Sequence, residues 1–230
     1  MCGLDKILAD VKEKFPKCSR KRLYEIQKKQ KLYAKRKRKY KATTNSNHKL
    51  PVAENILNQN FKVDKPGVVW VTDISYINTY EGWLYLSTVK DIFTKEIVGW
   101  ATADNMRTEL CIKALSNAIM RCKPLKGLLH HSDRGVQYCS YDYQSLLKKN
   151  SMVCSMSRKG NCFDNACAET FFSTIKCEFL YNNTYATREQ ARRDIFWYIE
   201  EFYKRKRRHQ ALNYMTPLKY KQKYYENLAA

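Results

Sequence analysis

The chain has 230 residues, with 43 Lys and Arg against 22 Asp and Glu, so its formal net charge is +21. Hydrophobic residues make up 44% of it and aromatic residues 13%, which supplies enough apolar surface for a core and excludes general disorder. No apolar run reaches the roughly 18–20 residues of a membrane span, and no secretion signal is visible, so we expect a cytoplasmic protein with reduced thiols.

The positive charge is concentrated at the two ends of the sequence. Residues 1–50 contain 17 Lys and Arg and 4 Asp and Glu, whereas residues 67–170 contain 12 and 10. Residues 204–223 contain eight basic residues and no acidic one. Basic ends can neutralise phosphates while a nearly neutral middle keeps its carboxylates for chemistry. We therefore expect a nucleic acid as partner; solvated basic linkers are the alternative.

Residues 1–34 predict a small helical segment. Apolar residues from Leu4 to Val11 follow helical spacing, and Ser19 can cap a second helix that carries Arg20 and Arg22. A tight turn before a basic helix is typical of a helix-turn-helix, which makes these arginines candidate DNA contacts. A helical hairpin that enters no groove is the alternative. Residues 35–66 are basic and polar with two prolines, and we interpret them as a linker.

From Val68 onwards the pattern changes to that of an α/β core, predicted to span residues 67–180. β-branched and aromatic residues predict a close-spaced antiparallel meander. Two further strands alternate with helices, which gives a mixed five-stranded sheet with flanking helices. The predicted strands are 68–77, 83–93, 96–103, 125–130 and 152–156, and the predicted helices begin at Thr108 and span 141–149.

The last part of the chain predicts a loop and two helices. Residues 157–165 show no periodicity and predict a mobile loop, after which Asp164 or Asn165 can cap a helix. Residues 181–230 predict a helical basic extension of the core. Its long helix begins at Thr187, which forms a capping box with Gln190, and runs into the basic tract at 204–209.

Three acidic residues are candidates for metal chemistry. Asp73 lies within an apolar strand, Asp133 directly follows a strand, and Glu169 lies on the helix after the loop, with 35 residues between it and Asp133. A carboxylate in an apolar strand costs free energy unless it is paired or binds metal. Taken singly, each could instead hydrogen-bond a turn or be solvated. Together they favour Mg²⁺ or Mn²⁺, which prefer oxygen ligands, over Zn²⁺.

A long ordered series of motifs also resembles one known family. The matching segments are SNHKLPVAEN, WVTDISYI, GWLYLSTVKDIFTKEIVGW, HSDRGVQY, SMSRKGNCFDNACAETFFSTIKCE and RRDIFWYIEEFYKRKRRHQALNYMTP. They resemble transposases of the insertion-sequence-three family, the second-reading-frame (OrfB) product, whose core is similar to retroviral integrase. The resemblance implies an RNase H-like fold. It places the family's Asp-Asp-Glu pattern on Asp73, Asp133 and Glu169, and its basic residue two turns later on Lys176.

The resemblance further implies a DDE-type transposase that performs metal-dependent strand cleavage and strand transfer at insertion-sequence ends. It implies two Mg²⁺ ions per site, with Mn²⁺ as a substitute, and DNA as partner, both terminal repeats and target. A homo-multimer, an upstream-frame (OrfA) partner and association with the nucleoid follow from it as well. The chain departs from the family at Cys162, at Lys204 and ahead of CGLDKIL, where the family has further helical sequence.

Several other basic residues are candidate phosphate contacts: Lys176, Arg134, Arg158, Lys159, Arg205 and Arg208. His130 and His131 beside Asp133 are interpreted as structural rather than metal ligands. Two alternatives to an active transposase stay open at this point. One is a DNA-binding remnant without catalysis, and the other is a nuclease of the same fold that hydrolyses without strand transfer.

Overall fold

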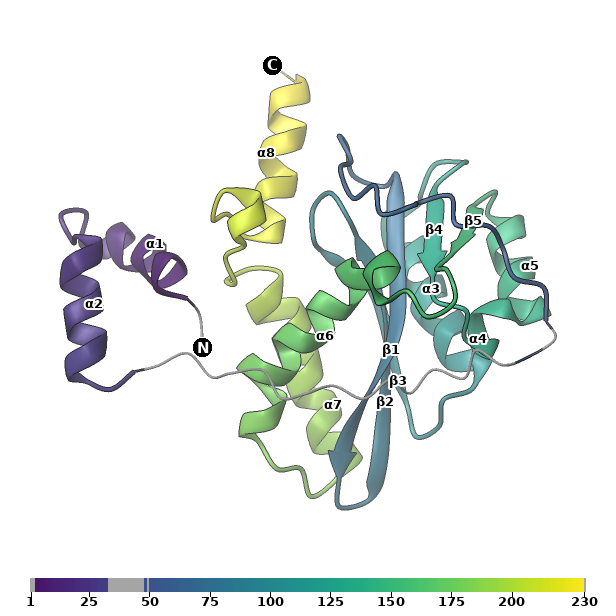
Figure 1. Cartoon of the computed structure of the whole chain (residues 1–230), viewed down its shortest axis with the longest axis horizontal. Helices are drawn as coiled ribbons and strands as arrows, with labels where there is room; N and C mark the ends of the chain where they lie inside the picture. Colours follow the sequence, from purple (N-terminus) through teal and green to yellow (C-terminus); the bar gives the residue numbers. More distant parts are fainter. Residues whose placement is uncertain (1–2, 33–47, 49, 230) are drawn as a thin grey trace.

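The computed structural model describes residues 3–32, 48 and 50–229, so the part of the predicted linker at 35–47 and 49 lies outside the described residues (Figure 1). Its strands are β1 (Val69–Thr79), β2 (Gly82–Asp91), β3 (Ile97–Ala103), β4 (Leu129–Ser132) and β5 (Val153–Met156). Its α-helices are α1 (Leu4–Lys14), α2 (Arg20–Lys29), α3 (Thr108–Cys122), α4 (Val136–Cys139), α5 (Tyr141–Lys149), α6 (Ala166–Glu178), α7 (Arg188–Phe196) and α8 (Pro217–Ala229). Short 3₁₀ turns are η1 (Cys162–Asn165), η2 (Leu180–Asn182) and η4 (Gln210–Leu212), and η3 (Trp197–Tyr203) is a π-helix.

The strands form one mixed sheet in the order β3-β2-β1-β4-β5. β1, β2 and β3 pair antiparallel, as the close spacing predicted. β4 and β5 continue the sheet parallel to β1. Parallel neighbours need a crossover, which α3 supplies before β4 and α4 with α5 supply before β5. The predicted mixed five-stranded sheet with flanking helices is confirmed.

Helices cover both faces of this sheet (Figure 1). On one face, Leu115 of α3 and Tyr143 of α5 belong to a core that includes Trp70 of β1. On the other face, Phe171 of α6 and Ile195 of α7 belong to a second core with strand residues of β1, β2 and β3. α6 therefore lies against the sheet through its apolar side, and its opposite side stays open to solvent.

Residues 50–66 form no helix or strand but pack along the core. Leu57 is 3% exposed and belongs to a small cluster with Val69 and Val71 of β1. The backbone amides of Ile56 and Leu57 both donate to the Ser155 hydroxyl of β5, at 3.0 and 3.1 Å. This segment is thereby fixed beside the parallel half of the sheet.

The N-terminal helices occupy the predicted positions. The Ser19 hydroxyl accepts a hydrogen bond from the Arg22 amide at 3.2 Å, which confirms the predicted cap of α2. Asp10 and Glu13 of α1 pair with Arg208, so α1 contacts the C-terminal part of the chain. No helix in the described part of the chain has the length and apolar character that crossing a membrane requires.

In the C-terminal third, the long helix predicted from Thr187 is not a single regular α-helix. The capping box of Thr187 and Gln190 is confirmed at the start of α7. The helix does not continue uniformly, because residues 197–203 wind as the π-helix η3. A π turn holds more residues than an α turn, and within this turn Tyr203 is 2% exposed whereas its neighbour Phe202 is only partly buried. The chain then forms α8, which the sequence analysis did not predict.

Candidate active site

Two of the three predicted carboxylates belong to neighbouring parallel parts of the sheet: Asp73 lies within β1, and Asp133 directly follows β4. β1 pairs with β4 as far as Val71 opposite His131. Asp73 and Asp133 each follow this pair by two residues, and the two side chains are close enough for the charge of Asp133 to raise the pKa of Asp73. Asp73 accepts a hydrogen bond from the Ile74 amide at 2.8 Å, and Asp133 accepts one from the Gly135 amide at 2.9 Å.

The third carboxylate, Glu169, lies in the first turn of α6, and several contacts hold this turn against β1. The Asn165 side-chain amide donates to the carbonyl of Thr72, the neighbour of Asp73, at 3.2 Å. The buried Lys90 ammonium of β2 donates to the Cys167 carbonyl at 2.8 Å. Ala168 is 2% exposed and belongs to the same cluster as Val71. These contacts bring Glu169 to the edge of the sheet that carries Asp73 and Asp133.

The three carboxylates influence one another electrostatically. Burial is the main cause that raises the pKa of Asp73 well above its usual range, and the charge of Asp133 is the second. The charge of Glu169 raises this pKa further. Burial and the charge of Asp133 also raise the pKa of Glu169. Like charges held close together disfavour full ionisation of the group. All three side chains nevertheless keep partial contact with solvent.

The donor set fits a hard divalent cation. Carboxylate oxygens are the ligands that Mg²⁺ and Mn²⁺ prefer, and a bound cation would relieve the repulsion that raises these pKa values. Over residues 3–32, 48 and 50–229, no three His, Cys, Asp or Glu side chains stand at metal-ligand distance. The three carboxylates gather where the pairing of β1 with β4 ends, but they are not all three at metal-ligand distance from one another.

Lys176 lies two turns after Glu169 on α6, beside Asp73. Its side chain is 9% exposed, and its ammonium nitrogen is 4.7 Å from the centroid of the Tyr76 ring. Burial lowers the pKa of Lys176, and the charge of Asp73 partly restores it. The sequence analysis predicted a cation near the carboxylates at this position; the ring of Tyr76 beneath it was not foreseen.

Asp164 has a different role from the predicted helix cap, and that prediction is wrong. Its carboxylate is buried and accepts from the Arg158 guanidinium at 2.8 and 3.0 Å and from the Arg158 amide at 2.8 Å. The side-chain amides of Asn55 and Gln59 donate to it as well, at 2.9 and 2.8 Å. These donors lower the pKa of Asp164. The cluster ties the loop before Glu169 to the segment at 50–66. Asn165 occupies the N-cap position of α6, but its side chain makes no capping bond.

The other predicted phosphate contacts lie at three separate places. Arg134 donates to the Ser157 carbonyl, beside the carboxylates, and Lys159 is exposed on the adjoining loop. Arg20 pairs with Asp5 at 2.8 Å, while Arg22 is exposed on α2. Further along the chain, Arg205 lies 3.6 Å from Glu201, and Arg208 pairs with Asp10 and Glu13.

The two histidines beside Asp133 are buried within β4. His130 lies 3.0 Å from the Tyr143 hydroxyl, and His131 lies 2.9 and 3.1 Å from the hydroxyls of Ser155 and Ser157. Burial lowers the pKa of His130 to about 3 and that of His131 to about 4. Both rings are therefore neutral near pH 7, which agrees with the structural role predicted for them.

Comparison with known proteins identifies the family. The family profile described as Integrase core domain matches residues 63–162, and a second profile of that description matches residues 150–217. The "Insertion element IS600 uncharacterized 31 kDa protein" of Shigella sonnei is 48% identical over 210 residues, which cover 91% of this chain and 77% of the relative. "Transposase InsF for insertion sequence IS3A" of Escherichia coli K12 is 41% identical over 192 residues, 84% of this chain and 67% of the relative. The chain belongs to the IS3 family of transposases.

Solved structures show the fold of this transposase. The HTLV-2 integrase catalytic core domain, in a structure with magnesium, is similar over 67% of this chain and 95% of its own, with a TM-score of 0.52 and 15% identity. The intasome of simian T-cell lymphotropic virus, bound to the regulatory subunit B56 gamma of PP2A, is similar over 69% of this chain and 55% of its own, with a TM-score of 0.51 and 16% identity. The RNase H-like fold expected from the sequence is confirmed.

Proposed function

We propose that this IS3-family transposase performs divalent-metal-dependent cleavage and strand transfer of DNA at insertion-sequence ends. The observation that carries the proposal is the convergence of Asp73 from β1, Asp133 from the end of β4 and Glu169 from α6, with the pKa values of Asp73 and Glu169 raised by burial and by the charge of Asp133. Perturbed titratable groups that gather at an open edge of a sheet are typical of active sites.

In the proposed site, Asp73, Asp133 and Glu169 would hold two Mg²⁺ ions, with Mn²⁺ as a substitute. When bound, such ions lower the pKa of an attacking water or 3′-hydroxyl and stabilise the oxygen that leaves phosphorus. Asp73 lies on β1, the central strand of the sheet, and would be the ligand that both ions share. Lys176, beside Asp73, would contact a phosphate of the reacting strand.

This chemistry needs no protein nucleophile, and two thiols buried in the core fit that view. Burial raises the pKa of Cys111 to about 12 and that of Cys139 to about 11. Both thiols are therefore protonated near pH 7, and a protonated thiol is a poor nucleophile.

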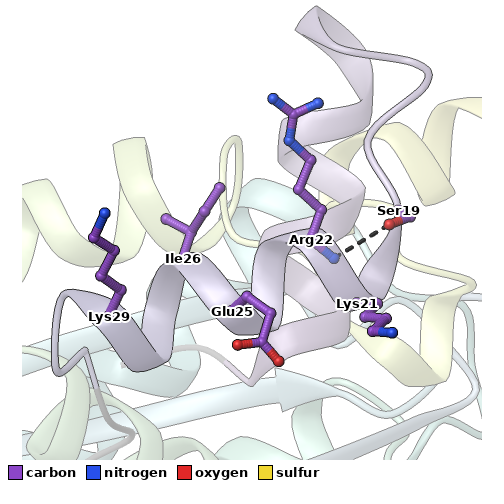
Figure 2. A pocket seen from close by; sticks show the side chains of 6 residues that line it. All are labelled: Ser19, Lys21, Arg22, Glu25, Ile26 and Lys29. Carbon is purple, nitrogen blue, oxygen red and sulfur yellow. Dashed lines mark hydrogen bonds between the residues drawn. The ribbon is translucent and has the colours of Figure 1, made fainter.

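The proposed DNA contacts surround the carboxylates and extend to α2. Arg134, Arg158 and Lys159 would contact phosphates near the reacting bond. On α2, Arg22, Ile26 and Lys29 project from the same side of the helix and line a shallow pocket of about 510 Å³ (Figure 2). A basic helix side of this kind fits the second helix of a helix-turn-helix, with Arg20 and Arg22 on DNA. Arg205 and Arg208 would add phosphate contacts from the C-terminal tract.

The proposal keeps the domain division of the sequence analysis. Residues 1–34 would bind element ends, 35–66 connect them to the core at 67–180, and 181–230 extend that core. It also includes a homo-multimer on DNA, cooperation with an upstream-frame product, and a location at the nucleoid in the cytoplasm. Close packing of the extension on the sheet, through Ile195 and Tyr198, supports treating it as part of the core.

The test compares Glu169→Gln with Glu109→Gln in a strand-transfer assay on element-end DNA, supercoiled target and Mg²⁺. Glu109 is an exposed glutamate that lies outside the site. Like Glu169, it lies in the first turn of its helix, here α3. We expect Glu169→Gln to lower strand transfer at least about 100-fold while DNA binding persists, because even outer groups around metal sites contribute 10–100-fold.

Three results would contradict the proposal, each in a different way. Retained strand transfer by Glu169→Gln would reject the catalytic assignment. Binding of element ends without cleavage by the unaltered chain would favour a DNA-binding remnant. Cleaved ends that are never joined to the supercoiled target would favour a nuclease.

A further inference from the structure

A pocket of about 420 Å³ lies beside the candidate active site, between the β1–β2 hairpin and the segment that follows α6. Its size is within the range of small-ligand sites. The pocket places several aromatic rings around one cation. Its lining includes Tyr76, Tyr80, Trp83, Lys176, Tyr181 and Tyr185.

Lys176 connects this pocket to the carboxylates. Its ammonium nitrogen lies over the Tyr76 ring and interacts with the charge of Asp73. Tyr76 lies three residues beyond Asp73 on β1, a distance of about 10 Å along an extended strand. The pairing of β1 with β4 ends at Val71, so β1 makes no further strand pair with β4 on the way from Asp73 to the pocket. Lys176 is thus the residue that the pocket and the carboxylates share.

Hydrogen bonds fix the walls of the pocket. Arg188 at the start of α7 donates from its amide to Glu81 at 2.7 Å and from its guanidinium to the Trp83 carbonyl at 3.1 Å. The Tyr80 amide donates to the Tyr185 carbonyl at 3.0 Å. The rings of Tyr76 and Trp83 meet edge to face with centroids 4.9 Å apart. The hairpin is thus held in place before any ligand binds.

The open rings and one hydroxyl give the pocket its chemistry. Tyr80 is 79% exposed and Trp83 47% exposed, so flat aromatic surface is available to a ligand. The Tyr185 hydroxyl is buried and, within the described residues, makes no hydrogen bond of normal geometry. Burial and the nearby Asp194 raise the pKa of Tyr185, which keeps this hydroxyl protonated as a donor.

We propose that this pocket receives one unpaired nucleobase of the DNA strand that passes the active site. The aromatic rings would stack on the base, and Lys176 would contact the adjoining phosphate. Stacking on aromatic side chains beside a positive charge is the general way in which proteins hold unpaired bases. Flat aromatic rings beside the Lys176 ammonium suit a base with its phosphate better than an apolar side chain of a second copy, which offers no negative charge to that ammonium. The inference rests on the proposed function, which makes DNA the substrate.

The test measures binding in EDTA, where no strand chemistry occurs, so its outcome is separate from that of the strand-transfer assay. The probes are a fluorescein-labelled oligothymidylate of roughly 12 nucleotides and the same strand with abasic residues, at two salt concentrations. We expect Trp83→Ala to weaken binding of the oligothymidylate about tenfold and leave binding of the abasic strand unchanged.

Three further variants complete the test. Tyr80→Ala should also weaken binding of the oligothymidylate, because Tyr80 is exposed at the tip of the hairpin and can be removed without disturbing the core. Trp83→Phe should bind the oligothymidylate nearly as the unaltered chain does. Tyr141→Ala, an equally exposed tyrosine on α5 at 72%, should bind both strands normally. The proposal is overturned if Trp83→Ala binds oligothymidylate normally or weakens both strands equally. A change in oligomeric state with unchanged DNA binding would overturn it in favour of a protein occupant.

Discussion

At the scale of single residues, the acids of the site shape its response to pH. Burial and mutual repulsion raise the pKa of Asp73, so the folded chain holds that proton at a pH where an unfolded chain has released it. The contribution of Asp73 to stability is therefore full below the ordinary pKa of an aspartate and is lost as pH rises through the raised value. The same sign holds for Glu169, whose pKa is also raised.

We predict that Asp73→Asn stabilises the chain in EDTA and flattens this pH dependence. The free energy of unfolding should rise by roughly 0.5–2 kcal/mol at pH 7, the range of single stabilising substitutions, because an amide carries no charge to repel Asp133. Urea unfolding from pH 5 to 8 measures it. His130 and His131, with pKa values of about 3 and 4, act in the opposite direction as pH falls below 6.5. The unaltered chain and Asp73→Asn share both histidines, so the histidine contributions cancel in the difference between their free energies of unfolding. A less stable Asp73→Asn at pH 7 would contradict the prediction.

Asp164 shows what a sequence reading misses at this scale. Its position before a helix favoured a cap, which is a local role. Its observed partners Asn55 and Gln59 are 109 and 105 residues away along the chain. No spacing rule links such residues, so only the folded chain shows that the segment at 50–66 is tied to the loop that precedes Glu169.

At the scale of elements, the sequence predicted most strands and helices because their periodicity is strong. Among the strands, β4 was the exception, predicted at 125–130 and found at 129–132. Its last residues, His131 and Ser132, are polar and buried by hydrogen bonds rather than by apolar packing, so hydropathy could not place them. The convergence of Asp73 and Asp133 depends on the parallel register of β1 and β4, which periodicity does not specify.

Close packing of α3 on β3 gives a second prediction. A Cβ atom on Gly99 would overlap the Ala114 carbonyl and lie 2.6 Å from the Ala118 Cβ. Gly99→Ala must therefore move the helix, and we expect a loss of about 1–3 kcal/mol in the free energy of unfolding. Urea titration checks this against Gly3→Ala, where a Cβ meets open space. Equal stability of the two variants would mean that α3 does not approach β3 this closely.

At the scale of the whole molecule, part of the basic C-terminal tract forms ion pairs within the chain itself. The charge count predicted phosphate neutralisation by residues 204–223. In the structure, several of these residues hold the chain together instead. Glu96 pairs with Lys204 at 2.7 Å and with Lys221 at 3.0 Å, and Glu178 pairs with Arg207 at 2.7 Å. Net charge shows that a basic surface is available but does not show which cations are already paired.

The central claim is that Asp73, Asp133 and Glu169 together bind a divalent cation, and the most direct measurement is the stability of the chain against Mg²⁺ concentration. A ligand that binds only the folded state stabilises it by roughly 2.7 kcal/mol at 100 times its Kd. We expect the urea midpoint of the unaltered chain and of Glu109→Gln to rise as the Mg²⁺ concentration rises. In Asp73→Asn we expect no such rise of the midpoint. An unchanged midpoint in the unaltered chain, or an equal gain in Asp73→Asn, would contradict the account.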